Sequence, residues 1–177
     1  MVIGNNKYTS NKYPNLSGAV VDADNFEAYL RGLSKLGTYI VDIISLRNAS
    51  RQDILTGFYS LQNNYSNWKD NAAIIVFYAG HGARTEKPKE WTDWDTSTGE
   101  VEMLCPSDIG VSDGSQTVVE GIYDRTISGL LNKLSEAMGT NIVSTFLSTW
   151  SLLFVNVLDL VDLDNGLLLL WRYHPRQ

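Results

Sequence analysis

The segment AAIIVFYAGHGA, residues 72–83, joins an entirely apolar run to a histidine that stands between two glycines. An apolar run of this length, without polar alternation, predicts a strand buried on both faces in the middle of a parallel sheet. Ligands of such sheets bind beyond the carboxyl ends of the strands, and His81 comes directly after that end. Taken alone, this histidine fits a polar turn residue as well as a reactive one, so its surroundings must decide.

The segments around this run show two kinds of pattern. Short β-branched or apolar runs predict strands, and apolar residues at helical spacing predict helices. In chain order they are a strand at 1–4, a helix over 19–33 capped by Ser17, a strand at 38–46, a helix reaching 61 and capped by Ser50, a strand at 101–104 and a helix from Asp124 to about Gly139. The alternation predicts a doubly wound α/β domain with a mostly parallel sheet.

Length and composition limit the classes of protein to consider. The 177 residues are 44% apolar and 19% charged, which fits one globular domain. The net charge is −6 and the 14 Lys and Arg residues are dispersed, so neither nucleic acid nor an anionic membrane surface is an expected partner. Cys105 is the only cysteine, which excludes an intrachain disulfide, and the polar residues after position 4 do not fit a secretion signal. A cytoplasmic location is therefore predicted.

Within an α/β domain, the position of His81 favours the reactive interpretation. Gly80 and Gly82 leave space for a substrate, and a histidine at a strand end is suited to act as a general base. The polar stretch 84–100 follows as a predicted loop. Its tryptophans, Trp91 and Trp94, either line a substrate site or form a lid packed on the sheet edge, and the lid is the favoured interpretation.

Four short motifs occur in order along the chain: VIG at 2–4, G-x-x-x-D-A at 18–23, YAGHGA at 78–83 and E-x-x-x-P-S-D at 102–108. Together they resemble the caspase-like cysteine peptidases, and most closely the metacaspase-type branch found in fungi. The resemblance covers roughly residues 2 to 142. It implies the caspase fold, a three-layer α/β sandwich whose mostly parallel central sheet lies between helices, and cleavage of peptide bonds by a Cys–His dyad.

The resemblance assigns roles to two residues. His81 matches the catalytic histidine of the dyad. Asp22 matches an acidic substrate-binding residue that in metacaspases lines the pocket for Arg or Lys at the cleavage position. Ala79 stands where many relatives have serine, so one polar group of that pocket is missing. The implied substrate is a polypeptide with a basic residue at the cleavage site.

The nucleophile of the family is missing from its expected place. It lies on a D-x-C or D-C-C-H-S type segment at the end of the next strand, which by spacing should begin near residue 141, but no cysteine occurs from there on. In caspases the histidine precedes this cysteine by about 50 residues. Cys105 follows His81 by only 24 residues and belongs to the P-S-D motif, so it is interpreted as a buried or loop thiol. We therefore expect an inactive chain, because the nearby hydroxyls show no sign of the base geometry or oxyanion hole that an alcohol needs: Ser144, Thr145 and Ser148.

Residues 143–177 are predicted to be a divergent tail after a caspase-like domain at 1–142, so the fold is expected to be incomplete at its C-terminal end. The 17 uncharged residues 142–158 are at the short limit for a bilayer span, and no membrane anchor is expected. Three interpretations stay open: a normal strand running into unrelated sequence, a membrane-associated tail, and a tail from read-through, alternative splicing or a misassembled exon, which is favoured. The segment Ile142–Leu147 can occupy the position of the missing strand.

Two hypotheses of different classes fit these observations. The first is a cysteine endopeptidase of metacaspase type that lacks its nucleophile, and the second is a non-catalytic caspase-like module that binds partners. No cofactor and no metal site are predicted. Calcium, which metacaspases often need, is the alternative, because Asp124 corresponds to an acidic calcium position. Arg125 stands where the family pattern has a second acid, however, and Asp124 is also explained as a helix cap. The sequence does not predict the oligomeric state.

Overall fold

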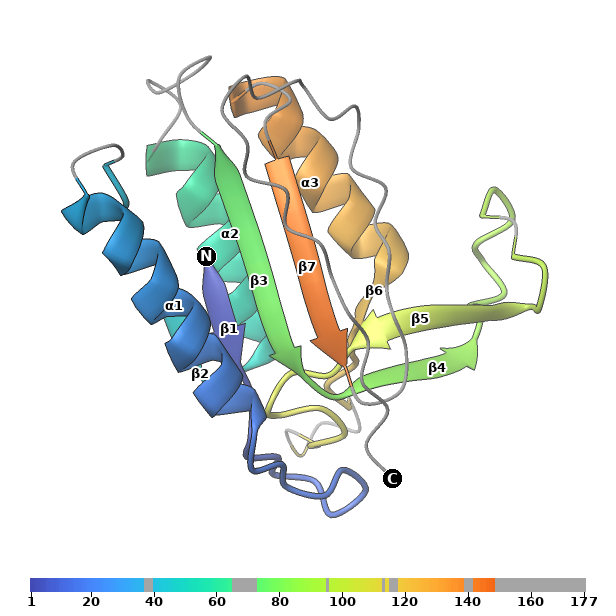
Figure 1. Cartoon of the computed structure of the whole chain (residues 1–177). Coiled ribbons are helices and arrows are strands. Elements are labelled where there is room, and N and C mark those ends of the chain that lie inside the picture. The colour runs from blue at the N-terminus through green and yellow to red at the C-terminus, as the bar shows by residue number, and fades with distance from the viewer. Residues whose placement is uncertain are drawn as a thin grey trace.

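The main sheet has four parallel strands in the order β2–β1–β3–β7 (Figure 1). They are β1 (Val2–Gly4), β2 (Ser45–Arg47), β3 (Ile74–Gly80) and β7 (Ile142–Ser148). The computed structural model describes residues 1–36, 40–64, 73–94, 96–112, 114, 118–138 and 142–148. Within them, the predicted α/β fold with a mostly parallel sheet is confirmed.

Three helices cover both faces of this sheet: α1 (Ala19–Lys35) on one face, and α2 (Arg51–Asn64) and α3 (Asp124–Met138) on the other (Figure 1). Successive strand residues point to opposite faces. Val2 and Phe77 therefore pack with α1, whereas Ile3 and Tyr78 pack with α2 and α3. This arrangement is the three-layer sandwich that the resemblance implies.

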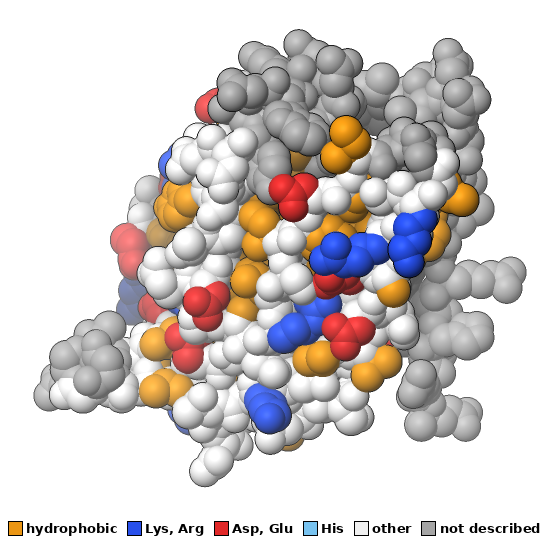
Figure 2. Space-filling view, turned by 90° about the vertical axis from the view of Figure 1, so that its left-hand side faces the viewer, with side chains coloured by type: hydrophobic (Ala, Val, Ile, Leu, Met, Phe, Trp, Pro, Cys, Tyr) orange, Lys and Arg blue, Asp and Glu red, His pale blue; other side chains and the backbone are white. Residues whose placement is uncertain are grey.

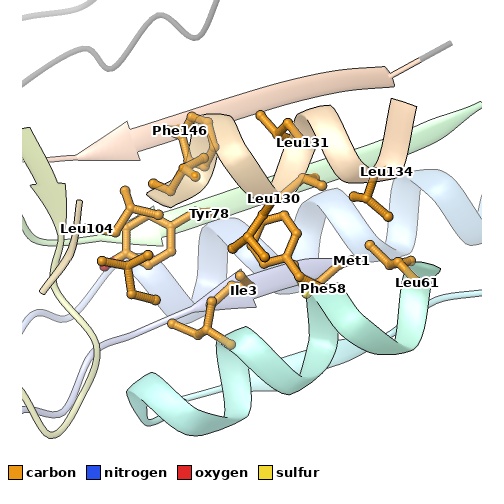
Figure 3. Packing of buried hydrophobic residues seen from close by; sticks show 14 of the residues in the cluster. Met1, Ile3, Phe58, Leu61, Tyr78, Leu104, Leu130, Leu131, Leu134 and Phe146 are labelled. Carbon is orange, nitrogen blue, oxygen red and sulfur yellow. The ribbon is translucent and has the colours of Figure 1, made fainter. Parts of the chain in front are cut away.

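Strand β3 lies in the centre of the sheet, between β1 and β7. Every residue of β3 except the half-buried Ile75 is buried. Figure 3 shows Tyr78 of β3 beside Leu104 in the core of the α2–α3 face, a cluster to which Phe58 and Leu130 of the two helices also belong. The central strand predicted at 72–78 is therefore confirmed with shifted bounds, because β3 runs from Ile74 to Gly80 and residue 72 lies outside the described part of the chain.

Strand β7 fills the second position beside β3. Its residues pair with β3 in parallel register, from Ile142 opposite Ile74 to Ser148 opposite Gly80. Phe146 is buried in the same core as α2 and α3. The expectation that residues 142–147 take this position is confirmed, and the domain boundary predicted at 142/143 falls inside this strand.

A second, antiparallel sheet follows the main one, with the strand order β4–β5–β6: β4 (Gly82–Glu86), β5 (Glu100–Leu104) and β6 (Ile122–Tyr123). The strand expected at 101–104 is confirmed, but the interpretation of residues 84–86 as loop is wrong. Arg84 lies opposite Glu102 and donates two hydrogen bonds to its carboxylate, at 2.9 and 2.6 Å. Polar cross-strand pairs of this kind stabilise a sheet with one solvated face. Because such a strand contains few apolar residues, a search for apolar runs does not detect it.

The strand predicted at 38–46 is shorter and later than expected. β2 begins at Ser45 because its partner β1 offers only three residues for pairing, and residues 41–44 have no regular structure. Residues 37–39 lie outside the described part of the chain. Arg47 at this edge forms ion pairs with Asp24 and Glu27 of α1. Figure 2 shows this side of the molecule, where acidic and basic side chains lie next to one another instead of forming a patch of one sign.

The two predicted helix caps have different outcomes. Ser17 does not cap α1: Gly18 is the N-cap residue, and Asn6 Oδ1 accepts a backbone N–H of the first turn at 3.1 Å. The cap therefore comes from the loop after β1, which a local pattern cannot show. Ser50 caps α2 as predicted, because its Oγ accepts the N–H of Asp53 at 3.2 Å while the Asp53 carboxylate accepts the N–H of Ser50.

Candidate active site

His81 lies directly after β3, in the single-residue connection to β4. Its side chain is buried, with 6% exposed, and Nε2 lies 2.8 Å from the carbonyl oxygen of Pro14. Because a carbonyl oxygen only accepts hydrogen bonds, Nε2 carries the proton, and the basic lone pair of the neutral ring is on Nδ1. The ring thus has a fixed tautomer and orientation, as a general base requires.

Two tyrosines from the loop after β1 line this imidazole. The ring centroids of Tyr8 and Tyr13 lie 4.8 and 6.4 Å from that of His81. Pro14 belongs to the same loop, so residues 8–14 enclose one side of the histidine. Sequence reasoning missed these residues, because a short polar loop with two tyrosines and a proline has no distinctive spacing.

Asparagine side chains attach this loop to the sheet. Asn5 is completely buried; its side chain accepts the N–H of Ala49 at 2.8 Å and donates to the Ala49 carbonyl at 3.2 Å. Asn48 Oδ1 accepts the backbone N–H groups of Asn6 and Lys7, both at 2.9 Å. Asn48 has a φ of 51°, a left-handed conformation in which asparagine is enriched. The Asn5–Asn6 pair directly after the first strand was the available signal.

Asp22 lies exposed in the first turn of α1. This turn packs against the carboxyl end of β1, where a Cβ on Gly4 would come within 2.7 Å of the Cβ of Ala23. Gly4 pairs with Ala79, two residues before His81. Asp22 and His81 therefore belong to the same end of the sheet, and the role of Asp22 in substrate binding stays a prediction.

The only thiol of the chain is unsuited to nucleophilic attack. Cys105 follows β5 and is completely buried in a cluster with Tyr8, Met103 and Ile109. Burial raises the pKa of the Cys105 thiol to about 12, so it stays protonated at neutral pH. Its interpretation as a buried thiol is confirmed.

Strand β7 brings its carboxyl end beside that of β3. Ser148 pairs in register with the last residue of β3, next to His81 in the chain, but its side chain lies outside the described part. Ser144 and Thr145 pair with residues in the middle of β3. Their register places these two hydroxyls in mid-strand and not at the strand end where His81 lies.

A family model described as the caspase domain matches residues 1–143. The chain belongs to the caspase family. The family model carries a peptidase name. No curated protein matches the sequence.

Among solved structures, this caspase-family chain is similar to protein GSU0716 from Geobacter sulfurreducens, a structural genomics target. The TM-score is 0.53 at 16% identity, and the match covers 83% of this chain and 47% of that chain. A likeness at this identity shows the fold alone. This caspase-family chain spans less than half the length of the protein that it matches.

The tryptophans of the caspase domain's β4–β5 connection pack against Arg125 of α3. Arg125 lies over the ring of Trp91 at 5.0 Å and over that of Trp94 at 5.7 Å, and it donates to both carboxylate oxygens of Asp93. Trp91 also meets the ring of Tyr123 in β6 edge-on, at 5.2 Å. The packing interpretation is confirmed for Trp91, whereas Trp94 lines a pocket together with Arg84 and Glu102, so the choice between lid and substrate site stays open for it.

Asp124, the position considered for calcium, has partners within the caspase domain. It begins α3, and its Oδ1 accepts the N–H of Arg125 at 2.7 Å. Burial raises the pKa of Asp124, and the negative charge of Glu102 adds to the rise. In the parts of the chain that the structure describes, no three His, Cys, Asp or Glu side chains gather as metal ligands would. No helix in those parts is long and apolar enough to cross a membrane.

Proposed function

We propose that this chain is a metacaspase-type pseudoenzyme: a caspase-family domain that keeps the general base of a cysteine endopeptidase and lacks its nucleophile. One contrast carries the proposal. The imidazole of His81 is oriented at the carboxyl end of the central strand, whereas the only thiol, that of Cys105, is buried and protonated.

The chemistry of thiol attack makes this contrast decisive. Only the thiolate attacks a scissile carbonyl, and a pKa of about 12 leaves roughly one thiolate in 10⁵ molecules at neutral pH. A histidine can remove a proton from a nucleophile but does not replace it. The chain as given is therefore expected to bind peptides without cleaving them.

Asp22 is the reason for proposing peptides with a basic residue at the cleavage position. An exposed carboxylate in the first turn of α1, at the same end of the sheet as His81, is suited to pair with the side chain of Arg or Lys. We assign this site to the peptidase-derived domain predicted at residues 1–142, whose sheet is completed by β7 at the start of the divergent tail 143–177.

The second candidate is a non-catalytic module that binds a protein partner. It is favoured by one observation: strand β7 completes the β3 ladder and its Phe146 completes the core, so the scaffold packs without a nucleophile segment. The exposed apolar side chains of Val21 and Tyr29 on α1 offer a surface beside Asp22 for such a partner.

A peptide cleavage assay tests the proposal. The purified full chain is incubated with fluorogenic peptides that end in Arg, Lys or Asp, with and without calcium, next to an active metacaspase. We expect no turnover of any peptide. Turnover that disappears in Cys105→Ala would show that this thiol is the nucleophile after all. Turnover that survives Cys105→Ala but is lost in His81→Ala would point to a hydroxyl nucleophile and would equally overturn the proposal.

A further inference from the structure

We infer that Tyr78 is a positioning residue for His81, whose hydroxyl holds the backbone of the histidine while Pro14 holds its ring. The Tyr78 hydroxyl lies 2.9 Å from the carbonyl oxygen of His81 and 2.8 Å from that of Cys105. It therefore connects the end of β3 with the end of β5. The inference rests on the proposal that His81 is the base of the site.

The hydroxyl of Tyr78 is a permanent donor. The side chain is completely buried, and burial raises the pKa of the phenol well above its usual range. The phenol stays protonated, and its hydrogen is shared between two carbonyl oxygens that cannot donate in return. Without this hydroxyl the Cys105 carbonyl would lose a partner and the His81 carbonyl would keep only the N–H of Cys105, which makes the contact costly to break.

A second tyrosine binds the N–H of His81, the other backbone polar group of the same residue. The hydroxyl of Tyr8 accepts the N–H of His81 at 2.8 Å and donates to the carbonyl of Asn5 at 3.3 Å. Gly80 leaves room for this arrangement, because a Cβ there would meet the hydroxyl of Tyr78 and would lie 3.0 Å from that of Tyr8. The histidine is thus held at its amide and its ring by the loop after β1, and at its carbonyl by Tyr78 of β3.

This three-point attachment explains how the backbone contributes to the orientation of the ring. A ring held only by the bond from Nε2 to Pro14 could rotate with the flexible glycines around it. With the backbone of His81 held at its N–H and its carbonyl, the Cα–Cβ direction is fixed as well, and the 2.8 Å contact with Pro14 has only the two side-chain torsions left to set. Tyr78 thus acts on the base through the backbone, without contact to substrate.

Histidine NMR of the full chain tests the inference. The chain has two histidines, so a His174→Gln variant with isotope-labelled histidine reports on His81 alone. In this reference we expect one tautomer, with the proton on Nε2. Tyr78→Phe should mix the tautomers and accelerate solvent exchange of the ring proton by about tenfold or more, the effect of one lost hydrogen bond.

Two control variants separate positioning from simple core packing. Tyr59→Phe removes a half-exposed hydroxyl from α2, and Phe58→Leu weakens the same hydrophobic core from the same helix. Neither should change the tautomer of His81, although Phe58→Leu should lower the melting temperature. Should Tyr78→Phe fail to fold, Tyr8→Phe carries the same expectation, because it removes the acceptor of the His81 N–H.

The outcomes are distinct. A single Nε2–H tautomer with unchanged exchange in the tyrosine variant overturns the inference, and so does equal tautomer mixing in Phe58→Leu. Neither readout needs turnover. Peptide cleavage by the chain would overturn the proposed function but not the inference about Tyr78. A mobile His81 ring in a chain that does not cleave peptides would overturn only the inference about Tyr78.

Discussion

The backbone amide of Cys105 donates a hydrogen bond to the carbonyl oxygen of His81 at 3.0 Å, while the thiol of the same residue is completely buried. The chain thus keeps its only thiol, on a residue bonded to its candidate base, in a place that solvent does not reach. We expect native Cys105 to react with iodoacetamide at least about 100-fold more slowly than in denaturant, because both burial and the raised thiol pKa oppose attack. Mass spectrometry of timed samples measures the two rates. Comparable rates would make the thiol a candidate nucleophile again.

The raised pKa of the Cys105 thiol also makes stability depend on pH. Between the ordinary value of 9.0 and the folded value of about 12, the folded chain keeps a proton that the unfolded chain releases. The free energy of unfolding should therefore be unaffected by this group below pH 9 and fall above it, by up to about 1.4 kcal/mol per pH unit. Urea titrations from about pH 8 to about pH 10 should show a shallower fall in Cys105→Ala. Equal slopes in both proteins would contradict the assignment.

The clearance around Gly80 gives a third prediction. A Cβ at this position meets the hydroxyls of Tyr78 and Tyr8, which are themselves buried and hydrogen-bonded. Gly80→Ala should lower the free energy of unfolding by about 2 kcal/mol. Gly129, on the exposed face of α3, has nothing within 4 Å, and its replacement by alanine should raise the free energy of unfolding by about 0.5–1 kcal/mol. Urea denaturation of the two variants checks both signs, and a stable Gly80→Ala protein would show that the tyrosine hydroxyls are not fixed there.

The main sheet was predictable because it is buried on both faces. The apolar run 72–78 needs no partner to be recognised, and the spacing of α1 and α2 shows their buried faces. Strand β4 was not predictable in the same way, since its polar residues are explained only by the cross-strand partner Glu102. The range predicted for β2 was wrong for a related reason: the length of β2 is set by the three residues of β1 and not by its own sequence.

The candidate site was predictable only at its centre. His81 stands out because a glycine-flanked histidine follows a buried strand, a signal within a few residues. Its ring partner Pro14 and its backbone partner Tyr8 come from a loop more than sixty residues away in the chain, where no local pattern marks them. Hydrogen bonds of this range depend on the tertiary fold, so they could be read only from the structure.

Arg125 provides a prediction for the β4–β5 connection. Its guanidinium lies over Trp91 and Trp94, so Arg125→Gln should shift the tryptophan emission to longer wavelength and lower the free energy of unfolding by about 1 kcal/mol. The matched control is Arg31→Gln, which removes a largely exposed pair with Glu27 four residues earlier in α1. That change should cost only about 0.3–0.5 kcal/mol and leave the emission unchanged. If Arg125→Gln has the spectrum of the parent protein, the stacking does not persist in solution.

The last prediction concerns the strand that stands where the nucleophile is expected. Phe146 of β7 is 4% exposed, pairs in register with Tyr78 and points toward α3 in the core (Figure 3). Phe146→Ala should therefore cost about 3–5 kcal/mol, a large part of the 5–15 kcal/mol that ordinarily stabilises a domain. Thr145→Ala, at the neighbouring half-buried position, should cost about 1 kcal/mol or less, because it removes little apolar volume. Urea unfolding followed by circular dichroism distinguishes the two. A Phe146→Ala protein as stable as Thr145→Ala would mean that β7 does not unfold together with the sheet, and that the scaffold of the proposed binding module ends at α3.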